Sequence, residues 1–204
     1  MNGNFYPESS FKKTLGKLVL KLLGGWTIEG DMPRDISKFI IIAAHHTSNW
    51  DFPVGVATKM ILRLNAKFFA KHSLFVGPLG ILMRSLGGVP IERSRSGNRV
   101  QEAIDEIKRS DNFVLVIAPE GTRSKVARWK TGFYHIAVGA EVPVVPIGFD
   151  FTHRKVVIGQ PMDMTGDIKT DFQKMHQFFV PYEGRYPELG CNEPASNPEI
   201  YLKR

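Results

Sequence analysis

A histidine and an aspartate stand five positions apart in a short polar segment, residues 45–51. His46 and Asp51 have the types needed for general-base catalysis, because a carboxylate bonded to one imidazole nitrogen fixes the tautomer and leaves the other nitrogen free to accept a proton. The segment lies between an apolar run and a helical pattern, so it should form a turn that can bring the two side chains together. Such a pair also occurs as a capping or core interaction, and the pair alone does not choose between these roles.

Two other assignments compete for the same segment. His45 is a rival base, but its adjacent position directs its side chain differently, so we expect a supporting or structural role for it. His45, His46, Asp51 and His72 are also acceptable metal ligands. They lack a recognised spacing such as two histidines four apart on a helix, so no metal is expected.

Basic side chains follow two other predicted strands. Arg93 comes just past the apolar run 88–91, at a strand end, where α/β proteins commonly place ligand contacts. A second loop follows the apolar run 113–117 and offers a glycine for close backbone approach, a hydroxyl and a guanidinium. These groups are Gly121, Thr122 and Arg123. Together with Arg93, they could hold a phosphate.

Short apolar runs alternate with segments of helical spacing after Pro33. This pattern predicts an α/β domain with a mostly parallel central sheet flanked by helices. Strands are predicted at residues 39–44, 66–70, 88–91, 113–117, 142–149 and 156–158. Helices are predicted at residues 52–64, 97–110, 131–140 and 168–179, the first with Asp51 placed to cap it. We expect an N-terminal helix within residues 1–30, a domain at 31–180 and a loosely ordered tail at 181–204, where Pro, Gly, Asn and Glu are dense.

The N-terminal segment predicts a basic amphipathic helix. Lys13, Lys17 and Lys21 recur four apart on one face, and apolar side chains share the other. The apolar face comprises Phe11, Leu15, Leu18, Val19, Leu22 and Trp26. This pattern suits a helix in the headgroup layer of an anionic bilayer. A helix packed on the domain with solvated lysines fits it equally well.

Composition limits the class of protein further. A chain of 204 residues, 43% of them hydrophobic, can bury a core without disulfides, and its net charge of +7 favours an anionic partner. The only cysteine, Cys191, has no nearby His-Asp partner and is expected to be an incidental thiol. Nucleic-acid binding is disfavoured because the lysines are not interleaved with exposed aromatics. No apolar run is long enough to span a bilayer and no signal-peptide cleavage site is evident, so we expect a cytoplasmic protein attached peripherally to the inner face of the membrane.

These loops, in this order, resemble the glycerolphosphate and lysophosphatidate acyltransferase family. Residues 46–51 are similar to its His-x4-Asp block. The second, third and fourth blocks resemble residues 88–93, 119–124 and 142–147, and Ala70, Lys71, Leu74, Pro78 and Gly80 resemble a segment between the first two blocks. The match covers about residues 40–150, and four ordered blocks are far more specific than one.

The resemblance implies a role for each residue. His46 would be the general base and Asp51 its orienting partner, while Lys71 could support the oxyanion of the thioester. The phosphate-bearing acceptor would be bound by Arg93, Glu120, Gly121, Thr122 and Arg123. The charge of Glu120 should repel a phosphate, so we expect it instead to orient an arginine or to accept a hydrogen bond from an acceptor hydroxyl.

The implied reaction moves a fatty acyl group from acyl-coenzyme A or acyl carrier protein to the hydroxyl of lysophosphatidate or a similar phosphate-bearing lyso-lipid, in phospholipid synthesis. His46 would take the hydroxyl proton directly, without a cofactor or a covalent acyl-enzyme. The chain has no Gly-x-Ser-x-Gly elbow to display a serine nucleophile, which agrees with direct transfer. The alternatives are an aminoacyl or other lyso-lipid acceptor, a hydrolase that activates water with the same pair, and a non-catalytic membrane-binding protein.

Overall fold

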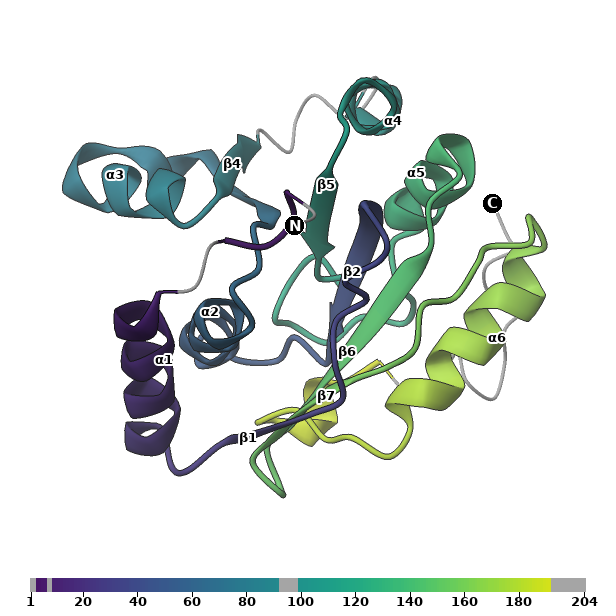
Figure 1. Ribbon diagram of the computed structural model, residues 1–204. Coiled ribbons are helices and arrows are strands. Elements are labelled where there is room, and N and C mark those ends of the chain that lie inside the picture. The colour runs from purple at the N-terminus through teal and green to yellow at the C-terminus, as the bar shows by residue number, and fades with distance from the viewer. Residues whose placement is uncertain (1–2, 7–8, 92–98, 192–204) are drawn as a thin grey trace.

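A seven-stranded sheet forms the centre of the protein (Figure 1). The computed structural model describes residues 3–6, 9–91 and 99–191. The strands are β1 (Thr27–Glu29), β2 (Lys38–Ala44), β3 (Lys67–Lys71), β4 (Gly88–Ile91), β5 (Phe113–Ile117), β6 (Val144–Asp150) and β7 (Lys155–Ile158), in the spatial order β1-β7-β6-β2-β5-β3-β4. Among the strand pairs of the described residues, only β6–β7 is antiparallel. The predicted, mostly parallel α/β fold is confirmed.

Helices cover both faces of this sheet. The α-helices are α1 (Ser10–Leu22), α2 (Asp51–Leu62), α3 (Gly77–Ser85), α4 (Arg99–Arg109), α5 (Gly132–Ala140) and α6 (Ile168–Phe179), and short 3-10 helices lie at His72–Phe75 and Pro187–Leu189. Besides the two 3-10 helices, one strand and one α-helix were not predicted from the sequence. Strand β1 has three residues and exists only by pairing with β7, and α3 leaves apolar residues such as Ile81 exposed, so its pattern does not mark a buried face.

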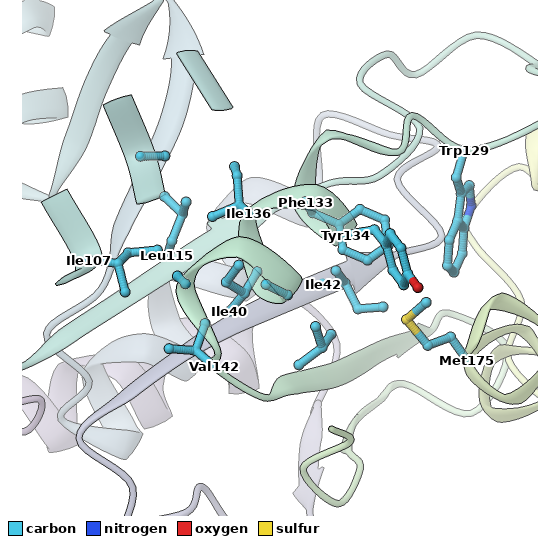
Figure 2. Close-up of a cluster of buried hydrophobic side chains, with 14 of the residues drawn as sticks. Ile40, Ile42, Ile107, Leu115, Trp129, Phe133, Tyr134, Ile136, Val142 and Met175 are labelled. Atoms are coloured by element: carbon cyan, nitrogen blue, oxygen red, sulfur yellow. The ribbon is translucent and has the colours of Figure 1, made fainter. Parts of the chain in front are cut away.

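Strand β2 lies at the centre and is buried on both faces, which explains its unbroken apolar sequence. Ile40 and Ile42 face the cluster that α4, α5 and α6 complete, and Figure 2 shows them beside Leu115 and Phe133. Phe39 and the other odd-numbered positions face the opposite cluster, which includes side chains of α1 and α2. The strand ends at Ala44, and the polar segment begins there.

Helix α1 packs against α2 with an unexpected face. Gly16 lies in the contact, where a Cβ would come within 2.8 Å of the Ala57 carbonyl oxygen, and Leu20 is buried. Four apolar side chains therefore point outward as an outer stripe: Phe11, Leu15, Leu18 and Leu22. Two predicted members of that face belong elsewhere, because Val19 is half-buried and Trp26 lies beyond the helix, buried edge-on against Phe151. None of the described helices has both the length and the apolar character needed to traverse a bilayer.

Candidate active site

Two loops meet at the carboxyl ends of neighbouring parallel strands. Strands β2 and β5 pair in register, with Ile42 opposite Ile117. The loop after β2 is residues 45–51, and we call it the catalytic loop because it carries the predicted catalytic pair. The loop after β5 begins at residue 118. Since parallel strands end at the same edge of a sheet, side chains far apart in the sequence converge there.

The structure brings His46 and Asp51 together. His46 Nδ1 lies 2.9 Å from Asp51 Oδ2, and the same oxygen accepts the Ser48 N–H at 3.0 Å. The Asp51 side chain is 1% exposed and that of His46 is 21% exposed. The predicted capping role of Asp51 was wrong: it is the first residue of α2, makes no capping bond, and turns its carboxylate back to the catalytic loop.

This arrangement has one chemical consequence for the imidazole. The Asp51 carboxylate can accept only from a protonated Nδ1, so Nε2 of His46 is the nitrogen with a free lone pair. The buried carboxylate also stabilises the imidazolium that forms when Nε2 takes a proton. The ring is partly exposed on the wall of an open groove, so a substrate hydroxyl can reach it.

Glu120 has a role that the sequence did not suggest. Its two carboxylate oxygens accept the backbone N–H of His46 at 3.2 and 3.1 Å, and Oε1 lies 3.6 Å from Nδ1 of the buried His45. Glu120 is 2% exposed and does not line the groove beside His46. It therefore holds the catalytic loop, instead of orienting an arginine or meeting an acceptor hydroxyl as expected.

The loop that follows β5 and contains Gly121, Thr122 and Arg123, hereafter the basic loop, lies next to the catalytic loop. Arg123 Nε donates to the Ser48 carbonyl at 3.1 Å, and Gly121, Thr122 and Arg123 all line the groove with His46. Gly121 has φ of 66°, and a Cβ there would come 2.9 Å from Lys130 Nζ. A residue with a side chain would be strained here and would displace the lysine.

Lys130 is a site residue that the sequence did not single out. It follows a stretch without strand-end or motif signal, but its N–H donates to the Pro119 carbonyl at 2.8 Å and its side chain lines the groove. The preceding Trp129 is 1% exposed in the core and anchors this loop. Of the other predicted residues, Lys71 lines the groove at the end of β3, and Arg93 lies outside the described residues. Among the described residues, no three His, Cys, Asp or Glu side chains converge as metal ligands.

A C-terminal segment, residues 182–191, covers the catalytic loop. The Tyr186 N–H donates to Thr47 Oγ1 at 3.2 Å, and a Cβ at Gly184 would lie 2.5 Å from that oxygen. The Arg185 guanidinium lies 5.4 Å from the centre of the Trp50 ring, and Cys191 is buried in the core. The expected loose order from residue 181 onward does not describe this segment, because its glycines serve close packing; residues 192–204 lie outside the described residues.

The groove beside His46, hereafter the His46 groove, has a volume of about 1970 Å³. Its lining includes the basic side chains of Lys71, Arg123 and Lys130, and Arg123 is bonded to the Ser48 carbonyl of the catalytic loop. Much of the remaining lining is apolar, with side chains from α2, β3, α3 and β4. These include Phe52, Phe68, Phe69, Leu79, Met83 and Val89. The groove thus brings basic side chains and a large apolar wall to the same cavity as the His46 imidazole.

A solved structure shares this fold, and several named proteins share part of this sequence. A structure of the 1-acyl-sn-glycerophosphate (LPA) acyltransferase, PlsC, from Thermotoga maritima superimposes with a TM-score of 0.56 and 29% identity, over 76% of this chain and 69% of that one. A Haemophilus influenzae protein named 1-acyl-sn-glycerol-3-phosphate acyltransferase is 27% identical over 75% of this chain and 71% of its own. A Cocos nucifera protein of the same name is 42% identical over 74% of this chain, which spans about half of that longer relative (48%).

A family model described as Acyltransferase matches residues 27–150. The matched region begins at β1 and ends with β6, so it contains the catalytic loop and the basic loop. Helix α1 and the segment 182–191 lie outside it. Since the model covers more than half of the chain and both active-site loops, this protein belongs to the Acyltransferase family.

Proposed function

We propose that this protein transfers a fatty acyl group from acyl-coenzyme A or acyl carrier protein to the hydroxyl of lysophosphatidate or a similar phosphate-bearing lyso-lipid, as a step of phospholipid synthesis. One observation carries the proposal: Nδ1 of His46 is bound to a buried carboxylate at 2.9 Å, while the ring lines a groove that also holds Arg123. The names of the relatives from Haemophilus influenzae and Cocos nucifera support the same reaction.

His46 acts first as a base and then as an acid. Nε2 takes the proton of the acceptor hydroxyl as its oxygen attacks the thioester carbonyl carbon, and Asp51 stabilises the resulting imidazolium. The C–S bond then breaks, and the imidazolium returns the proton to the departing thiolate. An ester and a free thiol leave the site, with no covalent enzyme intermediate. Lys71, in the lining of the same groove, is placed to offset the negative charge on the carbonyl oxygen.

The acceptor phosphate occupies the part of the His46 groove beside Arg123. Because Arg123 Nε is held by the Ser48 carbonyl, its two terminal nitrogens remain for a bidentate contact with phosphate. Thr122 supplies a hydroxyl and Lys130 a second positive charge. Arg93 belongs to this set by the family resemblance. The apolar side chains of the groove accommodate an acyl chain, since burying each CH₂ contributes about 0.8 kcal/mol.

Membrane attachment is the third part of the proposal. The outer stripe of α1 exposes Phe11 at 75% and Leu22 at 76%, and Lys13, Lys17 and Lys21 are exposed around it. Apolar side chains flanked by lysines suit a helix that lies in the headgroup layer of an anionic bilayer. In the predicted division of the chain, residues 1–30 attach the acyltransferase domain to the inner, cytoplasmic face of the membrane, where lyso-lipid is available.

The test compares donors and acceptors with purified protein. Acyl-coenzyme A and acyl carrier protein thioesters are each incubated with lysophosphatidate, with a monoacylglycerol that lacks phosphate, and with an aminoacyl lyso-lipid. We expect phosphatidate to form from lysophosphatidate, and His46→Ala and Asp51→Ala each to lower its rate by about 10²–10⁴-fold. His135→Ala, on the exposed side of α5, is the matched control and should retain full activity.

Three outcomes contradict the proposal. Fatty acid release independent of any acceptor indicates a hydrolase. Faster acylation of the aminoacyl lyso-lipid moves the acceptor to another class. Unchanged turnover in the His46 and Asp51 variants removes the catalytic pair.

A further inference from the structure

A second pocket, of about 670 Å³, lies on the other side of the catalytic loop from the His46 groove. We call it the Trp50 pocket. Its walls come from the end of α1, Trp26, the catalytic loop, Val54 of α2, the turn between β6 and β7 and the segment 182–191. Its described lining shares no residue with that of the His46 groove. Trp50 is its contribution from the catalytic loop, while the neighbouring residues Asn49 and Asp51 line the groove. The catalytic loop and the first turn of α2 therefore contribute to the walls of both cavities.

The chemistry of the Trp50 pocket is basic and aromatic. Arg154 and Arg185 both line it, together with Trp50 and Tyr186, and its described lining contains no acidic side chain. Arg154 Nη1 donates to the Gly24 carbonyl at 2.7 Å, which fixes the guanidinium at the pocket wall. Arg185 lies over the Trp50 ring, and neither arginine forms an ion pair among the described residues. Two such guanidiniums attract an anion that accepts several hydrogen bonds, and phosphate is such a group.

The position of this pocket relates it to the proposed membrane surface. Leu22, the last member of the outer stripe of α1, also lines the pocket and is 76% exposed. When the stripe enters the acyl boundary, the pocket beside Leu22 is placed at the level of the headgroups. Tryptophan and tyrosine side chains favour that level, because their rings are apolar with a polar edge. Trp50 and Tyr186 are both exposed at the pocket, at 47% and 45%.

We propose that the Trp50 pocket binds the phosphate of an anionic membrane phospholipid that is not the substrate. The inference rests on the proposed membrane attachment and adds a specific lipid site to it. The bound phosphodiester lies between Arg154 and Arg185, with its glycerol against Trp50 and Leu22. Since Trp50 directly precedes Asp51, an occupied pocket holds the catalytic loop from the side opposite the substrate. The anionic membrane is thereby a ligand of the enzyme as well as the source of its acceptor.

The test measures binding to vesicles of phosphatidylcholine with and without phosphatidylglycerol. The double variant Arg154→Gln with Arg185→Gln should bind the anionic vesicles at least about tenfold more weakly, because it removes two positive charges from a site at the membrane surface. Arg185→Gln alone should lose part of this binding, and this variant breaks no described hydrogen bond, so its fold is not at risk. Lys108→Gln with Lys174→Gln, on α4 and α6, removes the same charge elsewhere and should change binding less than about twofold.

A soluble ligand separates a pocket from a charged surface. Dihexanoyl-phosphatidylglycerol below its micellar concentration should change the tryptophan fluorescence of the parent protein and not that of the double arginine variant. The same titration with inorganic phosphate shows whether a free anion is enough to produce this fluorescence change. Equal losses of vesicle binding in the arginine and lysine variants, or undiminished binding in the arginine variants, would overturn the proposal.

Activity measured without vesicles keeps this test apart from that of the proposed function. With short-chain lysophosphatidate in solution, the arginine variants should keep at least about half of the parent rate, because His46 and Asp51 are unchanged. On anionic vesicles, their apparent KM for lipid should rise about tenfold, in line with weaker binding. A rate lost equally in both formats shows that the arginines act on catalysis and contradicts a separate lipid site. Vesicle binding remains measurable even if no acyl transfer occurs, so the failure of one proposal does not hide the other.

Discussion

The backbone N–H of His46 points at the carboxylate of Glu120, with both oxygens within 3.2 Å. These residues are 74 positions apart and meet because β2 and β5 are neighbours in the sheet. The buried Glu120 carboxylate thus fixes the start of the catalytic loop. At the other end of the loop, the Asp51 carboxylate binds the Ser48 N–H and fixes its middle.

Replacing Glu120 should therefore lower kcat more than it raises KM for the acceptor. Glu120→Ala leaves a buried N–H without its acceptor, at a cost of about 1–3 kcal/mol, and should reduce kcat at least tenfold. Glu120→Gln keeps one carbonyl oxygen for the same N–H and should retain most of the activity. Steady-state kinetics with varied lysophosphatidate measures both constants. If the main effect is a higher KM, Glu120 binds the acceptor, and its positioning role is wrong.

Arg123→Lys should raise KM for lysophosphatidate about tenfold or more, because lysine keeps the charge but loses the bidentate fork. The substitution also removes the bond from Nε to the Ser48 carbonyl. A phosphate-free acceptor should be used at similar rates by the parent and the variant. Ser124→Ala, at the exposed next position, serves as the matched control. An equal loss with both acceptors would place Arg123 in loop structure and not in phosphate binding.

His176 should make the protein less stable in acid. Burial and the nearby His45 lower the pKa of His176 to about 3, from 6.5 in the unfolded chain. Below pH 6.5 the unfolded state therefore binds a proton that the folded state excludes, so stability falls as the pH drops toward 3. This linkage amounts to about 2 kcal/mol at pH 5.

His176→Phe removes the titrating group and preserves an aromatic ring against Trp129. In the parent protein, the ring centres of Trp129 and His176 lie 3.8 Å apart. Urea unfolding at pH 7 and pH 5 should show a smaller loss of unfolding free energy in this variant than in the parent. The same loss in both proteins would show that other groups cause the acid sensitivity.

Leu18→Ser with Leu22→Ser should weaken binding to anionic vesicles without destabilising the domain. Both side chains are at least half exposed, at 50% and 76%, so little buried area is lost on substitution. Each loss of a membrane-inserted leucine should cost about 1.5–3 kcal/mol of binding, which vesicle sedimentation can measure. Thermal unfolding provides the control for the fold. If vesicle binding persists, the outer stripe is not the membrane contact.

The sequence alone predicted most elements, because their signals are local. Unbroken apolar runs predicted β2 and β5 with nearly the observed bounds, and helical spacing did the same for α4 to α6. His46 and Asp51 could be paired from the sequence because one turn joins them. The predicted N-terminal helix is present, but its pattern did not reveal which face packs, since Gly16 makes the contact and apolar side chains remain outside.

Only the tertiary structure decided which distant residues share the site. The order of strands in a sheet depends on pairings between remote segments, and no local pattern encodes that Glu120 would reach the His46 N–H. The same holds for Lys130 beside Gly121 and for Tyr186 on Thr47. The glycines of residues 182–191 resembled those of a loose tail because flexibility and close packing both favour a residue without a side chain. Residues that are close in the sequence can be paired from the sequence itself, whereas contacts between distant residues depend on how the strands and helices pack.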